Sequence, residues 1–178
     1  MTAMTVLAPP SVSADSVPPV SAGCAVVMDA DTGELLWSRH PDNPELIAST
    51  TKIMTAYLAC EAGELERPVT IPAEAVGVEG SSLYLKEGET LTREELLYGT
   101  MLQSGNDAAL ALAIDTAGSE AAFVDRMNVT ARQLGLQNTH YAYNNLRQIK
   151  RIILKYLNRT FLCQLRYPLN ELLTFHRI

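Results

Sequence analysis

Two short motifs contain residues of the types that serve nucleophilic catalysis. Ser49-Thr50-Thr51-Lys52 is followed about fifty residues later by Ser104-Gly105-Asn106. A Ser and a Lys three residues apart on a helix project from one face, with about 5–6 Å between their Cβ atoms, so the amine reaches the hydroxyl directly or through one water. A serine hydroxyl needs such a base, and a lysine serves when burial or a nearby positive charge lowers its pKa. The spacing predicts a nucleophile, an amine and a relay hydroxyl in one site.

The residues after Lys52 indicate a largely enclosed helix. Lys52 is the only charged residue of this segment before Glu61, and apolar residues recur at helical spacing at Ile53, Ala56, Tyr57 and Cys60. An unpaired buried lysine is costly, which makes Lys52 a functional candidate. The ordinary alternative is that Ser49 caps a helix and Lys52 is a solvated first-turn residue. The four-residue pattern alone does not separate these two interpretations.

The second motif is predicted to lie in a short polar loop between two apolar helices. The first helix starts with a T-x-x-E capping box formed by Thr92 and Glu95, and the second runs from residue 108 to 117 and is closed by Gly118. A scaffold can hold a hydroxyl and an amide toward a neighbouring cleft from such a loop. Taken alone, Ser104-Gly105-Asn106 also suits an ordinary interhelical turn.

The remaining patterns predict the elements that must position these motifs. They are a hairpin of residues 25–29 and 34–38 and helices near residues 50–61, 93–102, 107–117 and 119–134. The hairpin turns on Asp31-Thr32-Gly33, and Gly63 and Gly135 stand where helix C-caps belong. Two leading strands and then a run of helices describe an α+β sandwich, whose remaining strands should come from the C-terminal part of the chain.

Four segments together resemble the serine D-alanyl-D-alanine carboxypeptidases, the low-molecular-weight penicillin-binding proteins of peptidase family S11. The resemblance runs from about Cys24 to Tyr141 and lies in residues 25–37, 47–55, 80–85 and 102–109, in the family's order and at the family's spacing. It implies a serine β-lactamase/penicillin-binding-protein-like transpeptidase fold of class α+β. We expect that fold to be incomplete, with the hairpin and the helical part present and later sheet strands missing.

The resemblance implies a role for each motif residue. Ser49 is the expected acyl-ester nucleophile, which attacks the D-Ala-D-Ala peptide bond and releases the terminal D-alanine, and Lys52 is the expected general base. Ser104 is expected to relay the proton toward the leaving amine, and Asn106 to orient the substrate and the lysine ammonium. The backbone N–H of Ser49 is expected to supply half of an oxyanion hole. No metal and no organic cofactor is expected.

One part of the family pattern does not occur in this sequence. In the family, a K-T-G triplet on an edge strand binds the terminal carboxylate of the substrate, and the same strand donates the second oxyanion N–H. No Lys-Thr-Gly or Lys-Ser-Gly occurs in the 178 residues, and after Tyr141 the sequence departs from the family's. We therefore expect a C-terminally truncated or frame-disrupted carboxypeptidase that acts on peptidoglycan stem peptides and is inhibited by β-lactams.

Two alternatives to that function stay open. One is a catalytically inactive fragment, without the K-T-G element, that at most binds peptidoglycan or a membrane surface. The other is a class A β-lactamase-like enzyme, which shares the fold and the S-x-x-K tetrad but needs a deacylating Glu on a loop after the S-x-N element. The sequence around Ser49 and Asp29 fits the peptidase better.

The charge of the chain changes sharply after residue 144. Residues 1–144 contain 7 Lys or Arg and 19 Asp or Glu, whereas residues 145–178 contain 7 Lys or Arg and one acidic residue, Glu171. Such asymmetry can mark a nucleic-acid or membrane tail. An apolar stripe suits a cationic amphipathic helix for membrane-surface contact, but we favour a tail produced by a frameshift, a rearrangement or a misassembled reading frame; no nucleic-acid partner is predicted. The stripe consists of Ile149, Ile152, Ile153, Tyr156 and Leu157.

The chain therefore divides into three expected parts: residues 1–22, the partial catalytic domain 23–141, and the basic tail 142–178. Residues 1–22 are rich in Pro, Ser and Ala, contain no basic residue, and fit either an export-signal remnant or a disordered linker. The resemblance places the protein outside the cytoplasm, at the outer face of the cell membrane, in the periplasm or in the cell wall. Three cysteines argue against a disulfide framework, and the three histidines lack metal-ligand spacing.

The expected loss of later strands has a consequence for stability. The apolar face of the predicted hairpin would have no completed sheet beside it. We therefore expect marginal stability and an exposed strand edge that is prone to aggregation.

Overall fold

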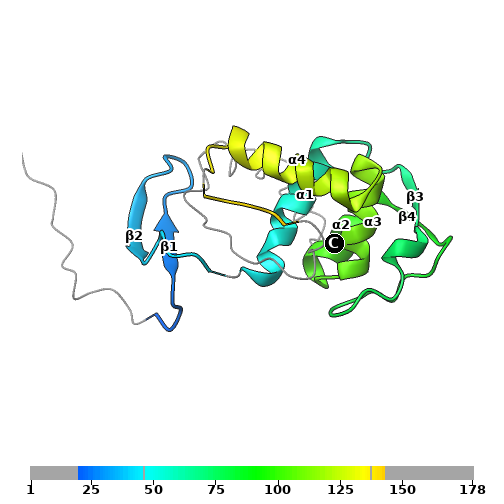
Figure 1. The fold of residues 1–178 in the computed structure, drawn as a ribbon, viewed down its shortest axis with the longest axis horizontal. Coiled ribbons are helices and arrows are strands. Elements are labelled where there is room, and N and C mark those ends of the chain that lie inside the picture. The colour runs from blue at the N-terminus through cyan, green and yellow to red at the C-terminus, as the bar shows by residue number, and fades with distance from the viewer. Residues whose placement is uncertain (1–19, 46, 137, 143–178) are drawn as a thin grey trace, which may run out of the picture.

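The computed structural model describes residues 20–45, 47–136 and 138–142 (Figure 1). A two-stranded hairpin of β1 (Ala25–Met28) and β2 (Leu35–Arg39) precedes a helical body. The body contains α1 (Lys52–Glu61), α2 (Arg93–Leu102), α3 (Asn106–Ala117), α4 (Glu120–Gln133) and a second hairpin, β3 (Pro68–Thr70) with β4 (Thr90–Thr92). The four helices predicted from the sequence are confirmed. The predicted amphipathic helix of the tail and most of the predicted N-terminal segment lie outside the described residues.

α3 is the central helix of the body. It contacts α1, α2 and α4, and every residue from Asp107 to Ala113 is buried. Most of these residues are alanine, and small side chains let neighbouring helices approach closely. As predicted, the helix ends at Gly118, which adopts a left-handed conformation. The second motif therefore stands at the start of a helix that is enclosed by its neighbours.

α1 lies between two hydrophobic clusters. Met54, Tyr57 and Leu58 pack with residues of α4, among them Phe123 and Met127. On the other side, Ala56 and Ala59 join a cluster with residues of α2, α3 and β3 that includes Leu96, Leu97, Leu112 and Val69. Burial on both sides confirms the prediction of an enclosed helix after Lys52.

The β3–β4 pair was not predicted from the sequence. Its strands are antiparallel, and Val69 of β3 pairs with Leu91 of β4. Three residues a strand are too few to show the alternation of apolar and polar residues that marks a strand. The pair nevertheless leads into α2, because Thr92 ends β4 and also caps α2. The predicted capping box with Glu95 is confirmed, since each residue's side chain accepts a hydrogen bond from the other's backbone N–H.

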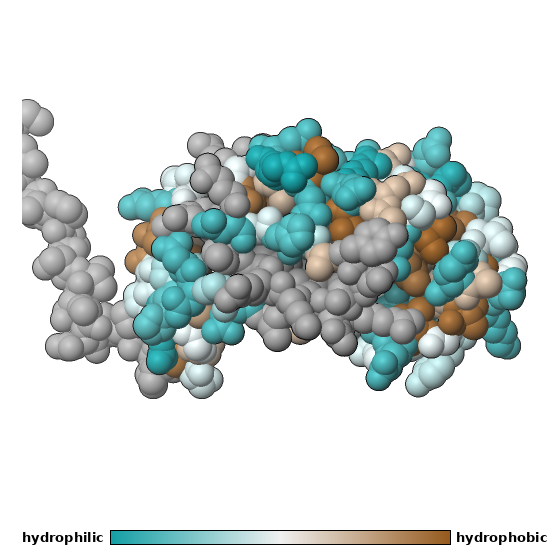
Figure 2. Space-filling model, in the orientation of Figure 1, coloured by the Kyte–Doolittle hydropathy of each residue, from teal (hydrophilic) through white to brown (hydrophobic). Residues whose placement is uncertain are grey.

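The first hairpin stands beside the helical body, at the left of Figure 1. Its predicted turn is confirmed, because Asp29 Oδ1 accepts hydrogen bonds from the backbone N–H of Asp31 and of Thr32, and Gly33 adopts a left-handed conformation. Hydrophobic side chains on it are exposed: Val26, Val27 and Leu36. Figure 2 shows brown side chains on the hairpin, whereas teal predominates along α4 at the top. Among the described residues, no helix is long and apolar enough to cross a membrane.

Candidate active site

Ser49 and Lys52 lie on one continuous helical segment. A turn of 3₁₀ helix, Ala48–Thr51, leads directly into α1, which begins at Lys52. Lys52 Nζ donates to Ser49 Oγ at 3.4 Å, so the predicted arrangement on one face is confirmed. The alternative of a capping serine and a solvated lysine is wrong. Ser49 caps neither helix, and Lys52 is only 5% exposed.

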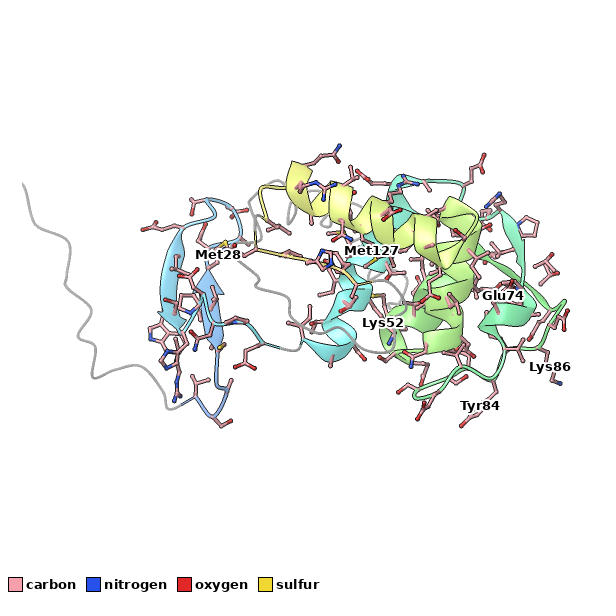
Figure 3. All side chains as sticks on the ribbon, in the orientation of Figure 1. Met28, Lys52, Glu74, Tyr84, Lys86 and Met127 are labelled. Atoms are coloured by element: carbon pink, nitrogen blue, oxygen red, sulfur yellow. The ribbon has the colours of Figure 1, made fainter. Side chains whose placement is uncertain are left out.

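The Lys52 amine joins the two motifs. Besides Ser49 Oγ, Lys52 Nζ donates to Ser104 Oγ at 3.3 Å and to Asn106 Oδ1 at 2.7 Å. Figure 3 shows Lys52 between α1 and the pair of helices α2 and α3, which are drawn in green. In the part of the chain that the structure describes, Lys52 forms no ion pair, so the oxygens around its amine are those of two hydroxyls and an amide. The structure therefore brings together all four side chains that the sequence analysis selected.

This environment suits an amine that acts as a base. Burial lowers the pKa of Lys52 below its ordinary value of 10.5, because the charged form loses its hydration. A neutral amine within hydrogen-bond reach of a serine hydroxyl can take its proton. The contacts to the two hydroxyls are longer than most N–H···O hydrogen bonds, which is common in sites without substrate.

A residue in the left-handed backbone region lies just before the first motif, and another lies within the second. Ala48, immediately before Ser49, has φ 45°, and Ser104 has φ 55°. Residues other than glycine adopt this conformation at a cost, and such strain collects at functional sites. Gly105 follows Ser104 and must be a glycine for a different reason, since a Cβ atom there would collide with the side chain of Leu83.

The amide of Asn106 is oriented by the loop of residues 79–85. Asn106 Nδ2 donates to the backbone carbonyl of Glu79 at 2.6 Å, and the Asn106 backbone N–H donates to the Ser81 carbonyl at 2.8 Å. With Nδ2 engaged on Glu79, Oδ1 faces the Lys52 amine. Residues 80–85 belong to the segments that resemble the family, but no role was predicted for them from the sequence.

Asp107 ties the same loop to the start of α3. Its carboxylate accepts hydrogen bonds from Ser82 Oγ at 2.7 Å and from the backbone N–H of Leu83 and Leu85. Burial alone would raise the pKa of Asp107. The hydrogen bonds from Ser82, Leu83, Leu85 and Ala108 outweigh it and hold that pKa below its ordinary value.

Asp107 was not predicted as a site residue from the sequence. A signal was present, because an acidic residue begins a helix whose next residues, Ala108–Ala113, are all apolar. The role predicted for the backbone N–H of Ser49 stays a prediction. Among the described residues, no group of three or more His, Cys, Asp or Glu side chains could hold a metal ion.

Comparisons with known proteins agree on one family. The model of peptidase family S11, described as D-alanyl-D-alanine carboxypeptidase, matches residues 11–145. The chain is similar to D-alanyl-D-alanine carboxypeptidase DacF of Bacillus subtilis, with 39% identity over 122 residues, which are 66% of this chain and 31% of DacF. It is also similar to DacA of Escherichia coli strain K12, with 39% identity over 136 residues, 70% of this chain and 34% of DacA.

Solved structures match as well. The D-alanyl-D-alanine carboxypeptidase DacD from Francisella tularensis has a TM-score of 0.72 and 32% identity, covering 86% of this chain and 38% of that one. Penicillin binding protein 5 from Haemophilus influenzae has a TM-score of 0.70 and 28% identity, covering 86% of this chain and 47% of that one. The chain spans about a third of the length of DacF and DacA.

Proposed function

Because the chain belongs to the D-alanyl-D-alanine carboxypeptidase family, peptidase S11, we propose that it is a serine hydrolase that removes the terminal D-alanine from peptidoglycan stem peptides. The predicted fold class is confirmed, since the penicillin-binding-protein fold is matched over part of the solved structures. The observation that carries the proposal is the contact of the Lys52 amine with Ser49 Oγ, Ser104 Oγ and Asn106 Oδ1. This contact supports the proposal, because an amine within reach of the Ser49 hydroxyl could take its proton.

The proposed reaction begins with acylation of Ser49. Ser49 Oγ attacks the carbonyl carbon of the D-Ala-D-Ala peptide bond while the neutral Lys52 amine takes the hydroxyl proton. The backbone N–H of Ser49 donates to the oxygen of the tetrahedral intermediate. The C–N bond then breaks, Ser104 passes the proton from Lys52 to the leaving amine, and D-alanine departs. Water hydrolyses the ester, again with Lys52 as base, and restores Ser49.

The proposed setting of the reaction follows from the family. Its members are generally extracytoplasmic, so we propose that this chain acts at the outer face of the cell membrane, in the periplasm or in the cell wall. Its partners would be stem peptides that end in D-Ala-D-Ala, and β-lactams would inhibit it by acylating Ser49. Residues 23–141 would then be the partial catalytic domain.

Release of D-alanine tests this proposal. The purified chain is incubated with a peptide that ends in D-Ala-D-Ala and with its L-Ala-L-Ala counterpart, and free D-alanine is measured. We expect release from the first peptide only, and a loss of about 10³-fold or more in Ser49→Ala and in Lys52→Met, because the nucleophile and its base act as a unit.

Thr50→Ala is the matched control, because Thr50 carries a hydroxyl beside Ser49 but donates it to the Ile47 carbonyl. This variant should release D-alanine at a rate close to that of the wild type. A folded chain whose D-alanine release equals that of Ser49→Ala would reject the proposal and favour the non-catalytic fragment.

A further inference from the structure

The two ends of α3 each carry an aspartate, and the two carboxylates have different partners. Asp115, near the C-terminal end, pairs with Arg93 at 2.7 Å and with Arg67. Asp107, in the first turn, is 1% exposed. In the described part of the chain Asp107 forms no ion pair, and it accepts hydrogen bonds from the Ser82 hydroxyl and from backbone N–H groups. Asp115 therefore belongs to an ion-pair cluster, whereas Asp107 organises a loop.

The loop that Asp107 organises also contacts the candidate active site. Asp107 binds the part of the loop at Ser82, Leu83 and Leu85. A few residues earlier, the carbonyls of Glu79 and Ser81 accept hydrogen bonds from the side chain and the backbone of Asn106. Asn106 and Asp107 are neighbours at the start of α3, so one short stretch of helix holds the loop at both places.

We propose that Asp107 is a positioning residue, which holds residues 82–85 so that the Glu79 carbonyl fixes the Asn106 amide and, through it, the Lys52 amine. The effect on catalysis rests on the proposed function. Without the Asp107 carboxylate, the loop would move away from α3 and release Asn106 Nδ2. The amide could then rotate, and Lys52 would lose the closest of its three hydrogen-bond partners in the site.

Asp107→Asn removes the carboxylate that accepts these hydrogen bonds, with almost no change in side-chain volume. Oδ2 of Asp107 accepts from Leu83 and Leu85, and Oδ1 accepts from Leu83 and Ala108. An asparagine must direct its amide nitrogen toward one of these two sets of backbone N–H donors, whichever way it turns. One backbone donor therefore loses its acceptor in either orientation.

The first measurement is the rate of acylation by a fluorescent penicillin in the full chain. A misplacement of about 1 Å in an active site can cost about 10²-fold in rate, so we expect a loss of about that size in Asp107→Asn. Asp115→Asn is the matched control, because it removes a carboxylate charge from the other end of the same helix, where the Asp115 side chain is 10% exposed. It should lower the thermal midpoint while its acylation rate stays within about twofold of the wild type.

The second measurement needs no catalysis. Hydrogen exchange of the Asn106 side-chain amide, followed by NMR with ¹⁵N-labelled chain, reports directly on the bond to Glu79. Exchange should be at least about tenfold faster in Asp107→Asn than in the wild type or in Asp115→Asn, since the closed state is lost. If the wild type is not acylated, the proposed function fails, and this exchange rate still decides the positioning role.

Two results would overturn the inference. One is a folded Asp107→Asn chain whose Asn106 amide exchanges as slowly as that of the wild type. The other is an equal loss of acylation in Asp107→Asn and Asp115→Asn at equal loss of stability, which would make Asp107 a general structural residue. If Asp107→Asn does not fold, Ser82→Ala replaces it, because it keeps the carboxylate and removes the Ser82 hydroxyl, which donates to Asp107 at 2.7 Å and accepts from the Tyr84 backbone N–H at 3.0 Å. Ser82→Ala, like Asp107→Asn, should make exchange of the Asn106 side-chain amide faster than in the wild type.

Discussion

Lys52 Nζ lies 2.7 Å from Asn106 Oδ1, closer than it lies to either serine hydroxyl of the site. The amine that the first motif supplies is therefore held most closely by the second motif, 54 residues further along the chain. The asparagine is in turn fixed by the Glu79 carbonyl. The position of the Lys52 amine thus depends on how α1, the start of α3 and the loop of residues 79–85 fit together.

The pH dependence of acylation should report on Lys52. Its pKa is lowered from 10.5 by burial, and only the neutral amine can take the Ser49 proton. The rate of labelling by a fluorescent penicillin should therefore rise with pH and level off with an inflection below 10.5. A rate that does not change with pH, or an inflection at or above 10.5, would contradict this assignment.

The lowered pKa of Lys52 also affects the stability of the folded chain. Between the lowered pKa of the folded chain and the ordinary pKa of the unfolded chain, the unfolded state binds more protons. The contribution of Lys52 to the free energy of unfolding should therefore increase with pH in that window. Chemical denaturation of the wild type and of Lys52→Met at several alkaline pH values measures this contribution. The free energy of unfolding of the wild type, relative to that of Lys52→Met, should increase with pH in that window.

Asn106→Asp should impair the site in a characteristic way. A carboxylate 2.7 Å from the Lys52 amine would favour the ammonium form and so raise the pKa of Lys52. Acylation at pH 7 should fall by about tenfold or more, and the inflection of the pH profile should move to higher pH. Asn106→Ala is the control, since it should lower the rate without an upward movement of the inflection. Equal profiles for the two variants would show that the charge has no effect on Lys52.

Gly80→Ala should damage both the loop and the site. Gly80 has φ 96°, and a Cβ atom there would lie 2.6 Å from Asn106 Nδ2, where it would displace the amide from Glu79. Gly118 also has a positive φ, 82°, but open space around it, so Gly118→Ala incurs only the backbone strain. That strain costs about 1 kcal/mol. Both variants should lose stability in thermal unfolding, but only Gly80→Ala should lose acylation, and wild-type acylation in Gly80→Ala would contradict the role given to the loop.

The two arginines that contact Asp115 should differ in their effect on stability. The Arg93 side chain is 4% exposed and that of Arg67 is 41% exposed. Arg93 also donates to the Gly63 carbonyl at the end of α1. Removing one partner of a buried pair costs about 3–5 kcal/mol, whereas exposed pairs contribute about 1 kcal/mol or less. Urea unfolding of Arg93→Leu and Arg67→Leu measures this difference, and equal losses would show that burial does not govern the cluster.

Leu36→Lys tests the predicted aggregation of the first hairpin. Leu36 is 60% exposed on β2, so a lysine there removes apolar surface and adds a charge that discourages pairing between strand edges. Light scattering at increasing protein concentration should show less association than in the wild type, while the free energy of unfolding changes by no more than about 0.5 kcal/mol. Unchanged association would exclude this face as the source of aggregation.

The elements with local signals could be predicted from the sequence. The start of α2 follows from the Thr92 and Glu95 capping box, and the end of α3 from Gly118, because both depend on residues within one turn. The meeting of Lys52 with Ser104 and Asn106 was predicted on the family resemblance as well as on spacing. The hydrogen bonds that Asp107 accepts from the loop were not predicted, because the donors at Ser82, Leu83 and Leu85 lie 22–25 residues earlier and two of them are backbone groups.

The most direct test of Ser49 activation by Lys52 is mass spectrometry of the chain after incubation with benzylpenicillin. We predict one covalent penicilloyl adduct for each chain, located by peptide mapping on Ser49, and absent from Ser49→Ala and Lys52→Met. Thr50→Ala should carry it as the wild type does. A folded wild-type chain without the adduct, or an adduct on another residue, would contradict the assignment of Ser49 and Lys52 as nucleophile and base.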